Sequence, residues 1–108
     1  MKLSTALTTK QLFFDEDGFL TDPELWDEKM AHQLADSHGI EELTSQHWHI
    51  IKTLREHFSE YGAVPMFHHV SHVNHLEKHF IENLFHSHRE AWLISGLPNP
   101  GEEAKTYM

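Results

Sequence analysis

The chain has 108 residues, 39% of them hydrophobic and 23% charged, which is typical of a single folded domain. With its 12 histidines neutral, 17 acidic and 8 basic residues give a formal net charge of −9, which argues against nucleic-acid binding. The chain has no cysteine, which excludes disulfides, thiolate metal sites and persulfide chemistry. We find neither an apolar run near the ~18 residues of a membrane span nor a signal peptide, so we expect a cytoplasmic protein.

The first predicted element is a β-hairpin near the N-terminus. Residues 10–14 are β-compatible, residues 15–18 have the chemistry of a turn that ends in glycine, and Phe19 begins a return strand. The turn carries three acidic side chains in a row: Asp15, Glu16 and Asp17. We expect these carboxylates only to solvate the turn.

A helix is predicted to begin at Asp22 and to end at Gly39. Asp22 is a good N-cap, and Pro23 suits the first helical position because its missing N–H would have no partner there. Apolar side chains follow at four-residue steps: Trp26, Met30 and Leu34. These positions indicate one buried face.

The next helix is predicted from Thr44 to Gly62. Thr44 can cap its start, while Leu43 and Trp48 occupy the two positions of a hydrophobic staple. The same face continues with Ile51, Leu54 or Arg55, Phe58 and Tyr61. Trp26 and Trp48 are expected to be core residues, as aromatic side chains at helical spacing usually are.

Three shorter helices and an arm are predicted in the second half. Pro65 opens a helix whose apolar positions are Phe67, Val70 and Val73. Another begins near Asn74, with an apolar stripe formed by Leu76, Phe80, Ile81, Leu84 and Phe85. The last runs over residues 89–95 and ends at Gly96. Residues 97–108 contain two prolines and few apolar side chains, so they read as an extended, mobile arm attached to a domain of residues 1–96.

Histidines are dense after residue 67, and four of them are spaced by four, three and four residues: His68, His72, His75 and His79. On one helix they would share a face, and imidazole binds Zn²⁺, Cu²⁺ or Ni²⁺, so a metal site is one hypothesis. A connector near Asn74 would instead break the helix and leave a solvated polar face. A third hypothesis is pH sensing, because Glu77 and Glu82 are available to histidines that become charged near neutrality.

Four stretches of sequence, in this order and spacing, resemble a known family. They are residues 14–20 (FDEDGFL), 43–44 with 47–51 and 54–56 (LT, HWHII and LRE), 64–65 (VP) and 96–100 (GLPNP). From Leu12 to Pro100 the chain resembles the TusE/DsrC/DsvC sulfur-relay family. The resemblance implies a DsrC-like fold: a mainly α, small helical bundle with a helix-turn-helix-like centre, an N-terminal β-hairpin and a flexible C-terminal arm.

The resemblance also identifies what this chain lacks. In the family the arm has a penultimate cysteine that accepts sulfur and delivers it to a partner, and DsrC-type members carry a second cysteine before the Gly-Leu-Pro motif. The matching positions here are Tyr107 and Trp92, neither of which can form a persulfide. Asn99 stands where the family usually has a basic residue. Trp92 could pin the arm, fill a partner's pocket or pack in the protein's own core, and the last is favoured.

We therefore expect a DsrC/TusE-like protein of sulfur metabolism that is not an enzyme and acts as a non-catalytic, partner-binding or regulatory homologue. Its expected partner is sulfite reductase or a sulfur-carrier protein. We expect it to bind neither nucleic acid nor a membrane, and to require no cofactor. The residues expected to bind the partner are Trp92, Leu97, Pro98, Pro100 and Tyr107. The alternative is a histidine-based metal-binding or pH-responsive protein on the same scaffold.

Overall fold

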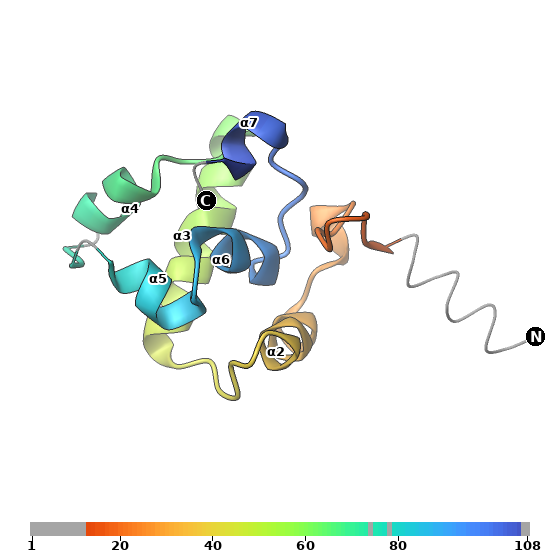
Figure 1. Ribbon diagram of the computed structural model, residues 1–108, viewed down its shortest axis with the longest axis horizontal. Helices are drawn as coiled ribbons and strands as arrows, with labels where there is room; N and C mark the ends of the chain where they lie inside the picture. The colour runs from red at the N-terminus through yellow and green to blue at the C-terminus, as the bar shows by residue number, and fades with distance from the viewer. Residues whose placement is uncertain (1–12, 74, 78, 107–108) are drawn as a thin grey trace, which may run out of the picture.

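One long helix organises the chain, and shorter helices pack around it (Figure 1). This computed structural model describes residues 13–73, 75–77 and 79–106, without the side chain of Val73. In order, the elements are the 3₁₀ helix η1 (Pro23–Leu25) and the α-helices α2 (Glu28–Ser37), α3 (Ser45–Tyr61), α4 (Phe67–Val73), α5 (Phe80–Phe85), α6 (His88–Ile94) and α7 (Glu102–Lys105). The prediction of a mainly helical protein is confirmed. Within the described ranges, no helix is both long and apolar enough to cross a membrane.

The central helix α3 begins and ends where the sequence predicts. The Thr44 hydroxyl accepts a hydrogen bond from the backbone N–H of His47, and His47 Nδ1 accepts one from the Thr44 N–H at 3.0 Å, which completes a capping box. Gly62 ends the helix with a left-handed φ of 65°. Because Nδ1 accepts, His47 Nε2 carries the proton and donates to the Leu84 carbonyl, 2.9 Å away. One buried histidine therefore caps α3 and joins it to α5.

The single helix predicted over residues 22–39 is wrong, because the segment is divided into η1 and α2. Trp26 lies between them with extended backbone, φ −75° and ψ 142°. Its indole Nε1 donates to the Ile94 carbonyl at 3.0 Å. Asp27 then serves as a second N-cap and accepts a hydrogen bond from the Met30 N–H at 2.8 Å. The bond from Trp26 to a distant segment overrides the local helical pattern.

The predicted N-terminal β-hairpin is not supported, since the described residues contain no strand. They form one isolated antiparallel bridge there, between Phe14 and Leu20. The Asp15 carboxylate accepts hydrogen bonds from the N–H groups of Asp17 and Phe19, both at 2.9 Å, so a side chain organises this turn. η1 begins three residues after Leu20, which leaves no length for a return strand. Residues 10–12 of the predicted first strand lie outside the described residues.

The two helices predicted after α3 are shorter than expected. α4 begins at Phe67 rather than at Pro65, and α5 begins at Phe80 rather than near residue 74, which itself lies outside the described residues. Between them the backbone of His75 is left-handed, with φ 57°. A left-handed residue interrupts a right-handed helix, and Leu76, the first residue of the predicted apolar stripe, therefore lies outside α5.

The last predicted helix, over residues 89–95, is found as α6 and lies in the middle of the core. The Ser87 hydroxyl caps it by accepting a hydrogen bond from the Glu90 N–H at 3.0 Å. α6 packs against α2, α3 and α5, and every residue from 91 to 97 is buried. The C-terminal arm therefore starts from a segment that belongs to the core.

Candidate functional site at the base of the C-terminal arm

Trp92, which the family resemblance matches to the second cysteine, is an internal anchor of the arm. Its side chain is 0% exposed and contacts Phe58 edge-to-face, with 5.9 Å between ring centroids. The indole Nε1 donates to the carbonyl of Pro98 at 2.8 Å. This bond joins α6 to the first proline of the arm and satisfies the one donor that a buried indole carries. The expectation that Trp92 packs in the protein's own core is confirmed.

The burial of these residues corrects the expected partner surface. Trp92 and Leu97 are 0% and 1% exposed, so neither can contact a partner unless the core opens. Pro98 and Pro100 are half-buried and keep some surface. Tyr107, which the resemblance matches to the penultimate family cysteine, lies outside the described residues. Of the expected partner-binding residues that are described, only the two prolines are therefore accessible.

Gly96 allows the close packing where the arm begins. Its φ is 73°, and a Cβ atom at this position would collide with the indole of Trp26. Arg55, from the LRE motif, reaches the same place: its guanidinium donates to the carbonyls of Ser95 at 2.8 Å and Pro23 at 3.0 Å. Burial lowers the pKa of Arg55. The sequence suggested Arg55 only as one option for an apolar face, but it joins η1 to the end of α6.

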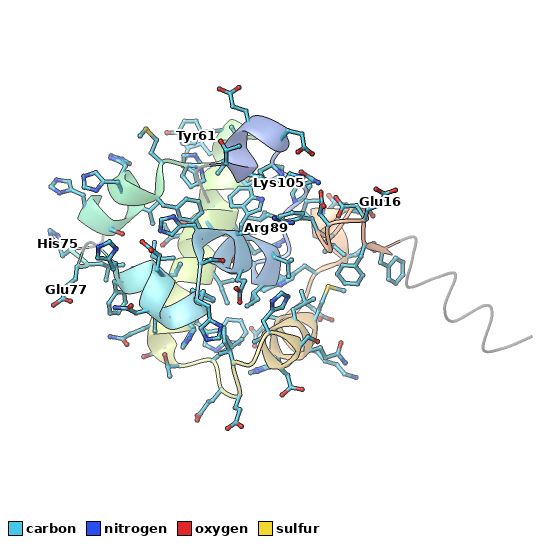
Figure 2. The ribbon with its side chains drawn as sticks, viewed as in Figure 1. Glu16, Tyr61, His75, Glu77, Arg89 and Lys105 are labelled. Carbon is cyan, nitrogen blue, oxygen red and sulfur yellow. The ribbon has the colours of Figure 1, made fainter. Side chains whose placement is uncertain are left out.

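The described part of the arm is docked on the N-terminal turn rather than extended. Asn99 Nδ2 donates to Asp15 Oδ2 and Asp17 Oδ2, both at 3.0 Å, and Lys105 Nζ donates to Asp17 Oδ2 at 2.6 Å. We call these four residues the arm–turn cluster. Arg89 of α6 adds a longer ion pair to Asp17, and Figure 2 shows it beside Lys105 on the side facing the turn. The expectation that the acidic turn is only solvated is wrong, because its carboxylates hold the arm.

Two members of the arm–turn cluster, Asp17 and Lys105, are stabilised in their ionised forms. The hydrogen bonds from Lys105 and then from Asn99 lower the pKa of the Asp17 carboxyl. The hydrogen bonds to Asp17 and then to Glu102 raise the pKa of the Lys105 amine. Asn99, which departs from the family's basic residue, thus becomes a neutral donor between two carboxylates. Separations of 82 and 84 residues kept these contacts from being predicted.

A groove of about 780 Å³ runs beside the docked arm. Its lining comes from the α3–α4 connection, from α4, from the start of α6 and from the arm: Val64, Pro65, Met66, Phe67, His68, His88, Pro100, Glu103 and Ala104. A smaller cavity of about 330 Å³ next to it includes Trp92, Pro98 and Pro100 in its lining. The accessible side of the arm base therefore faces a largely apolar groove.

The structure does not support the predicted histidine metal site. His68 and His72 lie on α4, whereas His75 follows it with a left-handed backbone and His79 is the N-cap of α5. Only His68 and His72 thus share a helix, as the hypothesis of a connector near Asn74 anticipates. The ranges that the structure describes contain no group of three or more histidine or acidic side chains suited to a metal ion.

Other histidines contact carboxylates in pairs. Glu82 lies 3.2 Å from His79 and 3.4 Å from His88. Burial lowers the pKa of His88. The charge of Glu82 partly opposes this shift, and His79 adds to it. Two further histidines from different elements contact one carboxylate of α6: Glu90, with His38 at 3.5 Å and His86 at 3.4 Å. The sequence pointed to Glu82 as a partner of histidines, but not to Glu90.

Comparison with known proteins finds a family model, curated relatives and solved structures that are similar to this chain. A family model described as "DsrC like protein" matches residues 6–102. A curated relative, "Sulfurtransferase TusE" of Salmonella choleraesuis, is 32% identical over 56 residues, which are 52% of this chain and 50% of that protein. "Sulfurtransferase TusE homolog" of Haemophilus influenzae is 37% identical over 51 residues, 47% of this chain and 46% of that protein. The chain thus spans about half the length of the curated relatives it matches.

Solved structures are similar over more of the chain. The oxidized gamma-subunit of the dissimilatory sulfite reductase (DsrC) from Archaeoglobus fulgidus is 38% identical, with a TM-score of 0.73 over 84% of this chain and 90% of that one. The structure titled dissimilatory sulfite reductase I (DsrI) gives a TM-score of 0.76 at 30% identity, over 82% of this chain and 86% of that one. The similarity in fold and the similarity in sequence therefore indicate the same family.

Proposed function

This chain belongs to the DsrC family, and we propose that it is a cysteine-less member that binds a protein partner of sulfur metabolism without carrying sulfur. A sulfur carrier needs a thiolate to form a persulfide and to pass it on by exchange, and this chain has no cysteine. It would therefore be a non-catalytic homologue. Its role would be to regulate an active carrier or to compete with it for the same partner.

The observation that best supports this proposal is the environment of Trp92. The position of a family cysteine is taken by a side chain that is 0% exposed and bonded to the arm through Pro98. An arm pinned in this way retains the family scaffold while its base is closed to thiol chemistry. The relatives suggest the partner class: sulfite reductase for DsrC-like proteins, or the sulfur carriers that work with TusE.

Competition binding tests the proposal. Purified sulfite reductase and sulfur-carrier proteins from the same organism would be immobilised, and this chain would be added together with a cysteine-bearing DsrC or TusE protein. We expect this chain to bind at least one of them and to displace the active carrier. A complete absence of affinity for every such protein would contradict the proposal.

A second candidate function, pH-dependent binding, is favoured by the histidine–carboxylate contacts. Glu82 faces His79 and His88, and Glu90 faces His38 and His86, so protonation creates ion pairs among α2, α5 and α6. Partner affinity should then change between about pH 5.5 and 8. The double variant Glu82→Gln/Glu90→Gln should bind with a weaker pH dependence. A wild-type binding curve that is flat over this range would remove the candidate.

A further inference from the structure

Large apolar side chains are exposed on both sides of the connection between α3 and α4. In the described part of the chain, the exposed large hydrophobic residues are Tyr61 at 65%, Met66 at 76% and Leu25 at 42%. Tyr61 is the last residue of α3, and Met66 directly precedes α4. A single exposed apolar side chain is ordinary, but Met66 also lines an apolar groove, and the two together indicate an interaction surface.

The groove beside Met66 is built from two parts of the chain. On one side lies the α3–α4 connection, and on the other lie Pro100 and Ala104 of the docked arm. Phe67 and His88 also line it, with their rings stacked in parallel at 4.4 Å between centroids. Since the arm supplies one side, the groove exists in this form only while the arm–turn cluster holds the arm in place.

Among its described lining residues, the groove has one acidic side chain and two histidines. Glu103 lines it, and the neighbouring Glu102 side chain is 93% exposed. No lysine or arginine is among the described lining residues, and the amine of Lys105 in the same helix is bonded to Asp17 and to Glu102. Complementary charge on an occupant would therefore be positive.

We propose that this groove docks a segment of a partner protein that inserts a large apolar side chain beside a lysine or arginine. The inference rests on the proposed function and deepens it, because it places the partner surface on the groove instead of on the buried Trp92. Met66 suits this role, since its flexible thioether adapts to an incoming side chain. The basic residue of the segment would pair with Glu103.

A display selection tests the groove without requiring the natural partner. A library of short random peptides would be selected against the full chain, and enriched peptides would then be measured against purified variants. Met66→Ser removes the apolar side chain, and Glu103→Lys reverses the charge. Leu25→Ser and Glu42→Lys are matched controls, because both positions are exposed and neither lines the groove.

We expect enriched peptides to carry an aromatic or long aliphatic residue next to lysine or arginine. Each groove variant should weaken their binding on the order of tenfold, as loss of a main anchor does, while both controls bind like the wild type. No enrichment, enriched peptides without a basic residue, or equal binding by the groove variants would overturn the inference. Concentration-dependent self-association abolished by Met66→Ser would also overturn it, because the occupant would then be a second copy. If a natural sulfur-metabolism partner binds the wild type and both groove variants with the same affinity, the assignment of the partner surface to the groove is wrong. The proposed function would still stand in that case.

Discussion

The arm is fixed to the body at two places, and the contacts there are of different kinds. At its base, Trp92 is 0% exposed and bonded to Pro98 inside the core. Beyond this anchor, Asn99 and Lys105 reach Asp17, whose side chain is 37% exposed, while that of Lys105 is 10% exposed. A buried anchor is insensitive to salt, whereas ion pairs at the surface are screened and contribute little to stability. The base therefore belongs to the fold, and we predict that the outer part of the arm can be released without unfolding the protein.

Replacing the anchor should have the largest effect. Trp92→Ala removes a fully buried aromatic side chain and should lower the free energy of unfolding by about 3–5 kcal/mol. Urea denaturation followed by circular dichroism measures this change. Trp48→Ala is the control, because Trp48 is only half-buried and its removal should lower the free energy of unfolding by less. Equal losses for the two variants would show that the base of the arm is not a special anchor.

A methyl group at Gly96 should have the next largest effect. Gly96→Ala combines the strain of a positive φ with a collision against Trp26. Gly62→Ala isolates the strain, since φ there is 65° and nothing lies within 4 Å of the added atom. We expect Gly62→Ala to lower the free energy of unfolding by about 1–2 kcal/mol and Gly96→Ala to lower it by more. Matching losses in the same denaturation assay would contradict the close approach of Trp26.

The pH dependence of stability should report the environment of His88. Burial lowers its pKa below the usual 6.5, so the unfolded chain binds the proton more readily than the folded one. Because of this difference in pKa, the free energy of unfolding decreases as the pH falls below about 6.5. His88→Phe, which keeps an aromatic ring against Phe67, should lose stability less steeply on acidification than the wild type. His69→Phe, at an exposed position, should follow the wild type. If both variants have the same slope, the assignment to His88 is wrong.

Breaking the arm–turn cluster should change stability least. Lys105→Met removes the ion pair to Asp17, so amide hydrogen exchange should accelerate in residues 98–106 while the unfolding midpoint barely moves. Lys52→Met is the control, because Lys52 is exposed and, among the residues that the structure describes, forms an ion pair only with Glu56 at 4.0 Å. High salt should reproduce the effect in the wild type. Unchanged exchange in the arm would contradict a role for the cluster in holding it.

The cluster also has a defined pH window. The pKa of Asp17 is lowered from 3.8, so its contribution is complete above that value and is lost as pH falls through the lower folded pKa. The pKa of Lys105 is raised from 10.5, so its contribution is present below that value and is lost only at higher pH. Protection of the arm should accordingly be constant near neutral pH.

Local signals in the sequence predicted one part of this molecule well. The Thr44 cap and the Gly62 stop gave α3 its bounds, because both act within one turn of the helix end. The break in the first predicted helix escaped prediction, because Trp26 bonds to Ile94, 68 residues away. The contacts of Asn99 with the N-terminal turn are equally distant in sequence. Only packing brings such pairs together, and no periodicity or cap encodes them.

The central claim, that the chain binds a sulfur-metabolism partner without carrying sulfur, is tested most directly by native mass spectrometry. The chain would be incubated with sulfite reductase or a sulfur-carrier protein from its own organism and with a persulfide donor. We predict a complex in which this chain keeps its unmodified mass. Sulfur bound to this chain, or no complex with any of these proteins, would contradict the claim.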